Sequence, residues 1–422
     1  MGGYVGWIAA VAAFALAAGC FGGGEAGREG AGAGSGADAA VEAGTGSGPG
    51  PGADSGAVVG AEAVGTENGT NGESGETAGG SGSGADGKRG DGAAVDVLRG
   101  EYRVLADGLE TPWAIDFAGE IVYVSERGGS VVRIGPEGDV ARKPVRLEKD
   151  VFVRGEAGFL GFALAPDFER SGTAYAYHTY QEAGEIRNRI VALEERDDAW
   201  VETNALLEGI PGGAIHDGGR LAFGPDGRLY ATTGDAGDEP LAQDPNSLAG
   251  KLLRMTADGK VPEDNPFAGS YVYSYGHRNP QGFAWNDAGE LYASEHGPSG
   301  RPGGHDEINR IEPGKNYGWP LVYGDARREG TVPPSFHTGD PAIAPSGVAF
   351  DAAGGLLVAA LRGEALFRFD PSDGSMEKVV EGEGRLRDVK ARDGRVYAIT
   401  NNTDGRGSPG PDDDRLLVWG AE

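Results

Sequence analysis

The sequence predicts an all-β fold, a six-bladed β-propeller preceded by a disordered N-terminal tether. A short phrase recurs six times between residues 112 and 419. In each copy an apolar strand ends in a bulky residue, a turn containing Gly or Asp follows, and a second strand opens with an apolar or aromatic residue. The copies begin at Pro112, Gly158, Gly218, Asn279, Pro345 and Arg385. Their spacing of roughly 40–65 residues is typical of propeller blades rather than of helical repeats.

Further strands and tight turns support this prediction. Most copies are followed by an apolar–apolar–Arg–apolar strand, read as VVRI, LLRM, INRI and LFRF. No long stretch of the folded part has a helical period, whereas segments such as 228–232 and 395–400 alternate or are rich in β-branched residues. Asp-Gly pairs at 226–227 and 393–394 fit hairpin turns.

The ring also has a predicted closure. The strand at about 102–105 belongs to none of the six copies, so we expect it to complete the last blade beside residues 416–419. Closure of this kind removes the open sheet edges that favour aggregation. Residues 98–422 would then form one propeller domain, long enough to bury a large core.

The first 97 residues have a different composition. The apolar run 8–18 is short for a membrane span and is followed by small residues, which predicts a secretory signal over residues 1–20. Ala17-Ala18-Gly19-Cys20 resembles a bacterial lipoprotein processing site, in which the cysteine becomes lipidated; an uncleaved anchor is the alternative. We therefore expect export and attachment to the outer face of the cell membrane by lipid alone.

Residues 21–97 are mostly Gly, Ala, Ser, Thr and acidic residues, a composition that cannot bury enough apolar surface to fold, so we expect a flexible tether. Cys20 is the single cysteine, which excludes an intrachain disulfide. The net charge of −28 argues against nucleic acid and against charge-driven binding to anionic lipid.

His216 is the first candidate for chemistry. It stands just before the third copy of the phrase, and a histidine there can act as a general base because its ordinary pKa lies near neutral pH. Asp235 follows the next strand of the same predicted blade, so it can return to the same end of the ring and orient the imidazole. An ordinary loop histidine and a turn aspartate are the alternatives.

A second candidate is the run Gly276-His-Arg-Asn-Pro280, which places several donors in a rigid turn before a strand. The planar fork of Arg278 suits a carboxylate or an oxyanion. Asn279 and the proline can instead serve only to shape the turn.

Two further sets suggest a cation and an anion. Residues 295–299, 304–309 and 315–320 are rich in carboxylates, amides and Gly-Pro carbonyls, which are ligands that Ca²⁺ prefers, although the spacing is not that of an EF-hand. Arg362, Arg385 and Arg387 stand at strand ends, and alternation puts the last two on one side of their strand. They suit an anionic ligand, with exposed ion pairs as the alternative.

Taken together, these motifs resemble the soluble, pyrroloquinoline-quinone-dependent sugar dehydrogenases, that is, the glucose/sorbosone dehydrogenase family and its aldose sugar dehydrogenase-like branch. The resemblance extends from about residue 108 to 419, through GLETPWAIDF, GEAGFLGFALAPDF, HDGGRLAFGPDG, SYGHRNPQG, EHGPSG, DEIN, KNYGWP and RLRDV in that order. It implies a six-bladed propeller that uses pyrroloquinoline quinone (PQQ) and Ca²⁺ to oxidise the anomeric carbon of aldoses to lactones. The implied partners are an aldose and a separate electron acceptor such as the respiratory chain.

The resemblance also implies residue roles. His216 matches the base that removes the C1 hydroxyl proton while hydride passes to the quinone, and Asp235 matches the carboxylate that holds this histidine. Other matched positions are the contacts of the reactive cofactor oxygens (Arg278, Asn279), the cations for its carboxylates (Arg362, Arg385, Arg387), the calcium carbonyls (Gly297, Pro298) and a second calcium site (Glu307, Tyr317).

Two positions depart from the family pattern. Glu156 stands where the family often has a glutamine that contacts the cofactor, so a carboxylate would face an anionic quinone. Ile215 stands where glucose-specific members have a sugar-binding aspartate, which favours a broad aldose range. A calcium-dependent hydrolase resembling lactonases, or a non-catalytic propeller that binds sugar or protein, are the alternative functions; the arginines disfavour the first and the His216–Asp235–Arg278 set disfavours the second.

Overall fold

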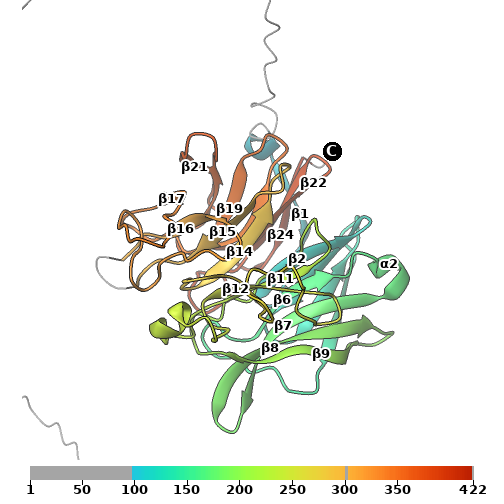
Figure 1. Ribbon diagram of the computed structural model, residues 1–422. Coiled ribbons are helices and arrows are strands. Elements are labelled where there is room, and N and C mark those ends of the chain that lie inside the picture. The colour runs from blue at the N-terminus through green and yellow to red at the C-terminus, as the bar shows by residue number, and fades with distance from the viewer. Residues whose placement is uncertain (1–96, 300–302, 421–422) are drawn as a thin grey trace, which may run out of the picture. The chain divides into compact units, whose positions relative to one another are not determined.

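The computed structural model describes residues 97–299 and 303–420, and this part of the chain is all-β and propeller-like (Figure 1). The predicted signal and tether, residues 1–20 and 21–96, lie outside the described residues. Helical structure between the strands is confined to short segments such as α2 (Phe168–Ser171) and the 3₁₀ turn η1 (Glu239–Gln243). No helix among the described residues is long and apolar enough to span a membrane.

Four of the sheets have four strands each. In spatial order they are β1 (Tyr102–Ala106), β24 (Leu416–Trp419), β23 (Arg395–Thr400) and β22 (Leu386–Arg392); β10 (Leu221–Phe223), β11 (Leu229–Thr233), β12 (Lys251–Met255) and β13 (Val272–Tyr275); β14 (Pro280–Trp285), β15 (Leu291–Glu295), β16 (Glu307–Ile311) and β17 (Phe336–His337); and β18 (Pro345–Phe350), β19 (Leu356–Ala360), β20 (Ala365–Phe369) and β21 (Met376–Glu381).

The fifth sheet has eight strands. Their spatial order is β2 (Pro112–Ala118), β3 (Ile121–Glu126), β4 (Ser130–Ile134), β5 (Val140–Arg146), β9 (Trp200–Pro211), β8 (Glu185–Glu195), β7 (Thr173–Glu182) and β6 (Phe159–Leu164). Its two halves meet where β5 and β9 pair in parallel, at Val145 with Trp200 and Arg146 with Val201. All other strand pairs in this sheet are antiparallel.

The predicted repeat is confirmed as a structural repeat. Each of the six copies forms two antiparallel strands, and VVRI, LLRM, INRI and LFRF lie in β4, β12, β16 and β20. The Asp-Gly pair at 393–394 joins β22 to β23 with both residues at positive φ, which is the geometry of a two-residue hairpin turn. The predicted closure is also confirmed, because Tyr102 of β1 pairs with Trp419 of β24.

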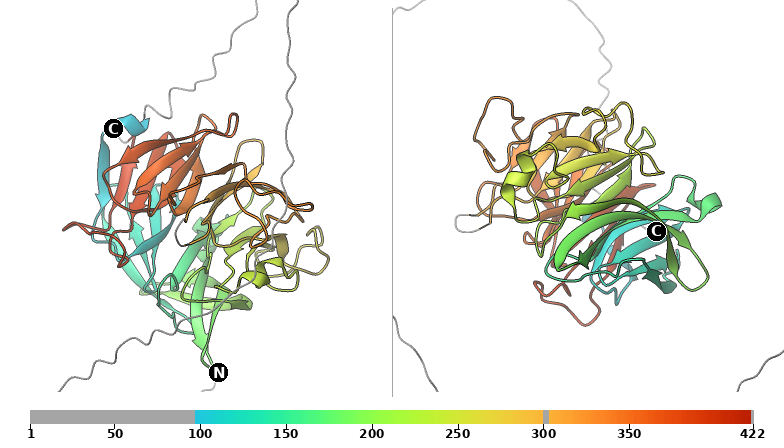
Figure 2. Two further views of the ribbon diagram at one scale, coloured as in Figure 1. Left: turned by 90° about the vertical axis from the view of Figure 1, so that its left-hand side faces the viewer. Right: turned by 60° about the horizontal axis from the view of Figure 1, so that its bottom comes forward.

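The first strands of the repeats lie near one another in chain order, within the sheets drawn in Figures 1 and 2. β2 contacts β6, β6 contacts β10, β14 contacts β11 and β18, β18 contacts β22, and β22 returns to β2. Equivalent positions of the repeat, the third residue of each first strand or, for β10, the residue just before it, are occupied by Ala114, Gly161, Arg220, Gly282, Gly347 and Asp388. Four of these residues are small, and the other two form an ion pair.

The small residues are required by close packing between neighbouring strands. A Cβ atom on Gly161 would lie 2.1 Å from the carbonyl oxygen of Gly219, and one on Gly282 would lie 2.1 Å from that of Ser346. A Cβ on Gly347 would lie 1.8 Å from Asp388 Oδ1. Each glycine therefore lets the next strand approach as closely as the backbone allows.

The ion pair at this level connects four strand regions. Arg220 Nη1 lies 2.8 Å from Asp388 Oδ2, and both side chains are buried. The same carboxylate oxygen accepts the backbone N–H of Ile115 on β2 at 2.8 Å, while Arg220 Nε donates to the carbonyl of Gln281 on β14 at 2.9 Å. The guanidinium also stacks on the ring of Trp113, 4.2 Å from its centroid.

We predict that Asp388→Ala lowers the free energy of unfolding by about 3–5 kcal/mol, because Arg220 then stays buried without a counter-charge. Urea unfolding followed by circular dichroism measures the change. The matched control is Asp198→Ala, which removes the aspartate of an exposed pair with Arg146 at 2.6 Å and should change little. Equal effects of the two substitutions would contradict the central role of the Arg220–Asp388 pair.

Candidate active site

The candidate residues come together because of how the strands run. In each repeat the second strand is antiparallel to the first, so its end lies beside the start of the first strand; Pro280 pairs with Glu295, and Pro345 with Ala360. Residues that precede a first strand and residues that follow a second strand therefore share one end of the sheets. All of the candidates taken from the sequence lie in or next to such segments or in the loops packed on them.

His216 and Asp235 form a hydrogen-bonded pair at this end. His216 precedes β10 with a φ of 60°, and its Nδ1 lies 2.7 Å from Oδ1 of Asp235, which follows β11. The side chain of His216 is 10% exposed and that of Asp235 is fully buried. An Nδ1–H that donates to the carboxylate leaves Nε2 as the proton-accepting atom of the ring, which is the arrangement of a held general base.

The carboxylate of Asp235 is itself fixed at both oxygens. Oδ1 also accepts the backbone N–H of Gly237 at 2.7 Å, and Oδ2 accepts the indole N–H of Trp319 at 2.8 Å. Each additional donor reduces the freedom of the carboxylate to rotate away from His216.

Glu156 contacts the His216 member of this pair. Its Oε2 accepts the backbone N–H of His216 at 3.0 Å and the side-chain amide of Asn279 at 3.1 Å, and its Oε1 lies 3.3 Å from Nη1 of Arg406. Burial alone would raise the pKa of Glu156, but His296, the His216 amide and Arg406 together lower it to about 2. The carboxylate is therefore ionised at neutral pH, and it already has a cationic partner.

Arg278 and Asn279 enter the site from the turn before β14. The Arg278 side chain donates to Ser299 Oγ at 2.9 Å and stacks over Trp319, 5.2 Å from its ring centroid, while its backbone N–H donates to Glu295. Burial lowers the pKa of its guanidinium. Asn279 Oδ1 accepts the backbone N–H of Gly218 at 3.1 Å. This side-chain amide therefore links the segments of Glu156 and His216 to the turn before β14.

The three predicted cations differ in their surroundings. Arg387 is buried and donates to Gln281 Oε1 at 2.8 Å, and burial lowers the pKa of its guanidinium to about 9. Arg385 is buried and pairs with Asp404 at 2.8 Å, so its charge is already opposed. Arg362 is exposed and follows β19, and the structure assigns its side chain no carboxylate partner among the described residues.

Several donors at this end of the sheets are buried without a partner. Within residues 97–299 and 303–420, no hydrogen-bond acceptor is found for the Nε atoms of Arg278, Arg385 and Arg387 or for Nε2 of His296. Buried polar groups are almost always paired in native proteins, so four such atoms together indicate a ligand site. Three permanently or largely cationic groups among them fit an anion with several acceptor oxygens.

The predicted metal residues are only partly brought together. Among the described residues there is no cluster of three or more His, Cys, Asp or Glu side chains arranged to hold a metal ion. The backbone N–H of Gly297 donates to Asp306 Oδ1 at 2.8 Å, and the carbonyl of Pro298 accepts the N–H of Gly304 at 3.3 Å. Among residues 97–299 and 303–420 this long hydrogen bond is the one found for the Pro298 carbonyl, which leaves the oxygen acceptor capacity.

Glu307 and Tyr317 have separate side-chain partners. The hydroxyl of Tyr317 donates to the Arg310 carbonyl at 2.7 Å and accepts the Glu312 N–H at 2.8 Å, so it is not directed at the Glu307 carboxylate. The structure instead brings Glu307 near Glu295. Burial and the charge of Glu295 raise the pKa of Glu307 to about 8.

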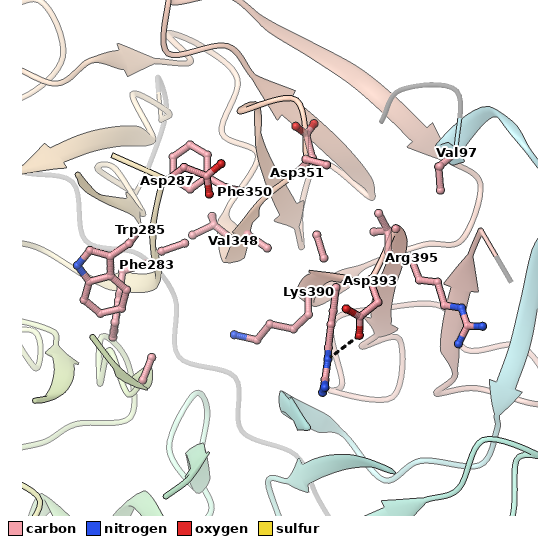
Figure 3. Close-up of a pocket in the computed structure, with 18 of the residues that line it drawn as sticks. Val97, Phe283, Trp285, Asp287, Val348, Phe350, Asp351, Lys390, Asp393 and Arg395 are labelled. Carbon is pink, nitrogen blue, oxygen red and sulfur yellow. Dashed lines mark hydrogen bonds and ion pairs between the residues drawn. The ribbon is translucent and has the colours of Figure 1, made fainter. Parts of the chain in front are cut away.

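A separate cavity lies at the opposite strand ends, away from all of these residues (Figure 3). Its volume is about 640 Å³, and it is lined by the ends of β10, β14, β18 and β22, including Phe283, Trp285, Val348, Phe350 and Lys390. None of the candidate residues lines it. The candidate chemistry and this largely apolar cavity therefore occupy different ends of the same strands.

Four further residues at this end have no clear signal in the sequence. His296 and Trp319 lie within the motifs EHGPSG and KNYGWP, but no pattern in either motif marks these two residues for a role. Arg406 and Asp404 lie in the loop after β23, where Gly, Pro and Asp suggest only turns. Their pairing with Glu156 and Arg385 depends on contacts between distant segments, and spacing along the chain does not show these.

Comparisons with known proteins agree on one family. The family model for Glucose / Sorbosone dehydrogenase matches residues 109–412. The PQQ-bound aldose sugar dehydrogenase of Streptomyces coelicolor is 41% identical, with a TM-score of 0.69 over 75% of this chain and 96% of that one. A putative oxidoreductase (glucose dehydrogenase) of Thermus thermophilus is 42% identical, with a TM-score of 0.70 over 76% and 99%. Aldose sugar dehydrogenase YliI of Escherichia coli is 33% identical over 72% of this chain and 90% of its own.

Asp217, the neighbour of His216, provides a test of this geometry through pH. Its Oδ1 accepts Asn188 Nδ2 at 2.9 Å and the Gly213 N–H at 3.0 Å, and its Oδ2 is buried without a partner among the described residues. Burial raises its pKa to about 7. Because the pKa in the unfolded chain is lower, the folded state is favoured while Asp217 is protonated, and this stability is lost as pH rises from about 4 through 7.

We predict that Asp217→Asn removes this loss. Between pH 5 and pH 8 the wild-type protein should lose on the order of 2 kcal/mol more of its unfolding free energy than the variant, which keeps an acceptor for Asn188 and Gly213. Urea unfolding at the two pH values measures both. The same pH dependence in the two proteins would show that Asp217 is ionised in the folded state.

Proposed function

Because the chain belongs to the glucose/sorbosone dehydrogenase family, we propose that it is a PQQ-dependent dehydrogenase that oxidises the anomeric carbon of aldose sugars to lactones. When bound, PQQ supplies the hydride acceptor and Ca²⁺ a Lewis acid. The observation that carries the proposal is the His216–Asp235 pair beside three buried arginines whose Nε donors lack partners among the described residues.

The donor set fits the cofactor. PQQ is a tricarboxylate, and charge-assisted hydrogen bonds to carboxylates are among the strongest that a protein makes. Arg387 and Arg385 would hold carboxylates, and Arg362 would add an exposed cation at the same strand ends. Arg278 and Asn279, nearest to His216, would face the reactive oxygens.

In the proposed reaction, Nε2 of His216 takes the proton of the C1 hydroxyl of the sugar, while the C1 hydrogen leaves as hydride. Asp235 accepts the Nδ1–H bond throughout, which keeps Nε2 turned toward the substrate and stabilises the imidazolium that forms. The sugar loses two electrons and two hydrogens and becomes the lactone.

Glu156 is compatible with this proposal because of Arg406. Relatives that resemble this chain often have a neutral glutamine here, whereas the Glu156 carboxylate is ionised. The Arg406 guanidinium, 3.3 Å away, opposes its charge, and the amides of His216 and Asn279 take the other oxygen. The pair presents less net charge to an anionic cofactor than the glutamate alone.

For calcium, we propose the carbonyls of Gly297 and Pro298 at the cofactor. Glu307 is the proposed ligand of a second calcium, where a cation would offset the repulsion from Glu295. Tyr317 would join that site through its backbone carbonyl, since its hydroxyl is bonded to Arg310 and Glu312.

We also infer six blades. The eight-stranded sheet divides into β2–β5 and β6–β9. Among the described residues, the one strand pairing between these halves is the short parallel one of β5 with β9, two residues from each strand. Each half then carries one copy of the repeat, as each four-stranded sheet does.

The first test is reconstitution of the purified protein with PQQ and Ca²⁺, followed by dye reduction with an aldose. We predict that His216→Gln lowers turnover about 10²–10⁴-fold, because a positioned base is lost. Its affinity for PQQ, measured by tryptophan quenching, should stay near that of the wild type. His337→Gln, at an edge strand, is the matched control, and near wild-type turnover of the His216 variant would exclude it as the base.

The proposed function also leads us to predict a broad substrate range. Ile215 is 44% exposed beside His216 and has no atom that accepts a hydrogen bond from a sugar hydroxyl. An apolar wall discriminates weakly between hydroxyl patterns. We expect kcat/KM for glucose, galactose and xylose to agree within about tenfold, or about 1.4 kcal/mol. A preference for glucose above roughly a hundredfold, about 2.7 kcal/mol, would contradict the argument.

We further propose, from the sequence alone, that Cys20 carries a lipid that holds the protein on the outer face of the cell membrane. Cys20→Ser should then move the protein from the membrane fraction to the soluble fraction without loss of dehydrogenase activity. Mass spectrometry of the wild-type N-terminus provides the direct check. A wild-type protein without lipid at Cys20 would end this proposal.

A further inference from the structure

One buried side chain contacts both halves of the proposed catalytic machinery. The indole N–H of Trp319 donates to Asp235 Oδ2 at 2.8 Å, and the face of the same ring lies 5.2 Å from the guanidinium of Arg278. Trp319 is buried, and it comes from the loop after β16, 84 residues beyond Asp235.

The loop that carries Trp319 is held on both sides. The backbone N–H of Trp319 donates to the carbonyl of Gly276 at 2.9 Å, and Gly276 lies two residues before Arg278. The Trp319 carbonyl accepts Gln243 Nε2 at 2.6 Å, and Gln243 also exchanges hydrogen bonds with Asn316 at 3.0 and 2.8 Å. Gln243 lies in the loop that begins with Asp235, so the indole is positioned relative to both of its partners.

We propose that Trp319 is a positioning residue for the dehydrogenase reaction: its N–H fixes the second oxygen of Asp235 so that the first faces His216, and its ring holds the guanidinium of Arg278. The proposal rests on the proposed function for its consequence in catalysis. The contacts on which it depends are made between groups of this chain alone.

The expected consequence follows from the charge on Asp235. Its carboxylate is fully buried, and Oδ2 has no hydrogen-bond donor among the described residues other than Trp319. Without that donor the negative charge concentrates on Oδ1, which stabilises the protonated imidazole and raises the pKa of His216. The carboxylate also becomes free to rotate, so the imidazole is less often in the productive orientation. Charged groups near the pair include Glu156, which accepts the His216 N–H, Asp217, which follows His216 in the chain, and Arg278, whose charge acts on Asp235; the substitution alters none of these side chains chemically.

The decisive variant is Trp319→Phe, which keeps an aromatic ring beside Arg278 but removes the N–H. We expect kcat to fall roughly 10- to 100-fold, as for loss of a hydrogen bond to a charged group, with KM within about twofold. The acid limb of the kcat/KM profile should move to higher pH. Trp319→His, which retains a ring N–H, should recover part of the loss. Trp285→Phe, in the opposite cavity, is the matched control and should leave all of these values unchanged.

A readout without cofactor separates this inference from the proposed function. The chain has six histidines, so selective ¹³Cε1-histidine labelling gives a short spectrum, in which His216→Gln assigns the His216 signal. In the apoprotein, Trp319→Phe should raise the midpoint of the His216 titration while Trp285→Phe does not. If the wild-type protein oxidises no aldose, the proposed function fails but this titration still decides the role of Trp319. An unchanged His216 titration in Trp319→Phe overturns the inference whatever the activity.

Discussion

The structure depends on the buried ion pair between Arg220 and Asp388. Two charges at 2.8 Å with almost no exposure are costly to bury, and hydrogen bonds of Asp388 to the Ile115 N–H and of Arg220 to the Gln281 carbonyl offset part of this cost. The four residues lie on β2, just before β10, on β14 and on β22. The pair therefore helps to set the mutual register of those strands, and Gly347 leaves the space that the Asp388 carboxylate occupies. Hydrophobic contacts alone, being non-directional, would not fix that register.

Fixing the first strands also fixes where the polar residues gather. When the first strands are in register, their starts lie at the same end of the sheets. The segments that precede the first strands and those that follow the second strands then meet at this end, although they come from distant parts of the chain. Glu156 and Arg406, 250 residues apart, are an example. Three buried arginines, Arg278, Arg385 and Arg387, stand at this end although the chain carries a net charge of −28. The net charge of the whole chain therefore does not predict which charged groups the site contains.

The parts of this arrangement that repeat along the chain could be predicted from the sequence. Local patterns predict the six strand pairs and the pairing of His216 with Asp235, since both partners of each contact lie in one repeat. They also predict the closure of β1 on β24, because these two strands lie at the two ends of the series of repeats. Contacts between loops of different repeats could not be predicted. Trp319 on Asp235 and Arg406 on Glu156 depend on loop conformations that no periodicity records. The contact of the Tyr317 hydroxyl with Arg310 lies within one repeat, but it too depends on the conformation of a loop. The same is true of the parallel pairing that merges two repeats into one sheet.

Glu156 shows how these levels combine. A carboxylate beside the proposed anion site would oppose an anionic ligand, and the lowered pKa of Glu156, about 2, keeps this carboxylate charged. Its stabilisation comes from the His216 amide, from Asn279 and from Arg406, whose loop is placed by the closure of the last sheet. If that loop were displaced, the carboxylate would keep its charge and lose its cation, and the site would become less favourable for an anion. The electrostatics of the candidate site therefore depend on the closure of the last sheet by β1, and β22 of the same sheet carries Asp388 of the central pair.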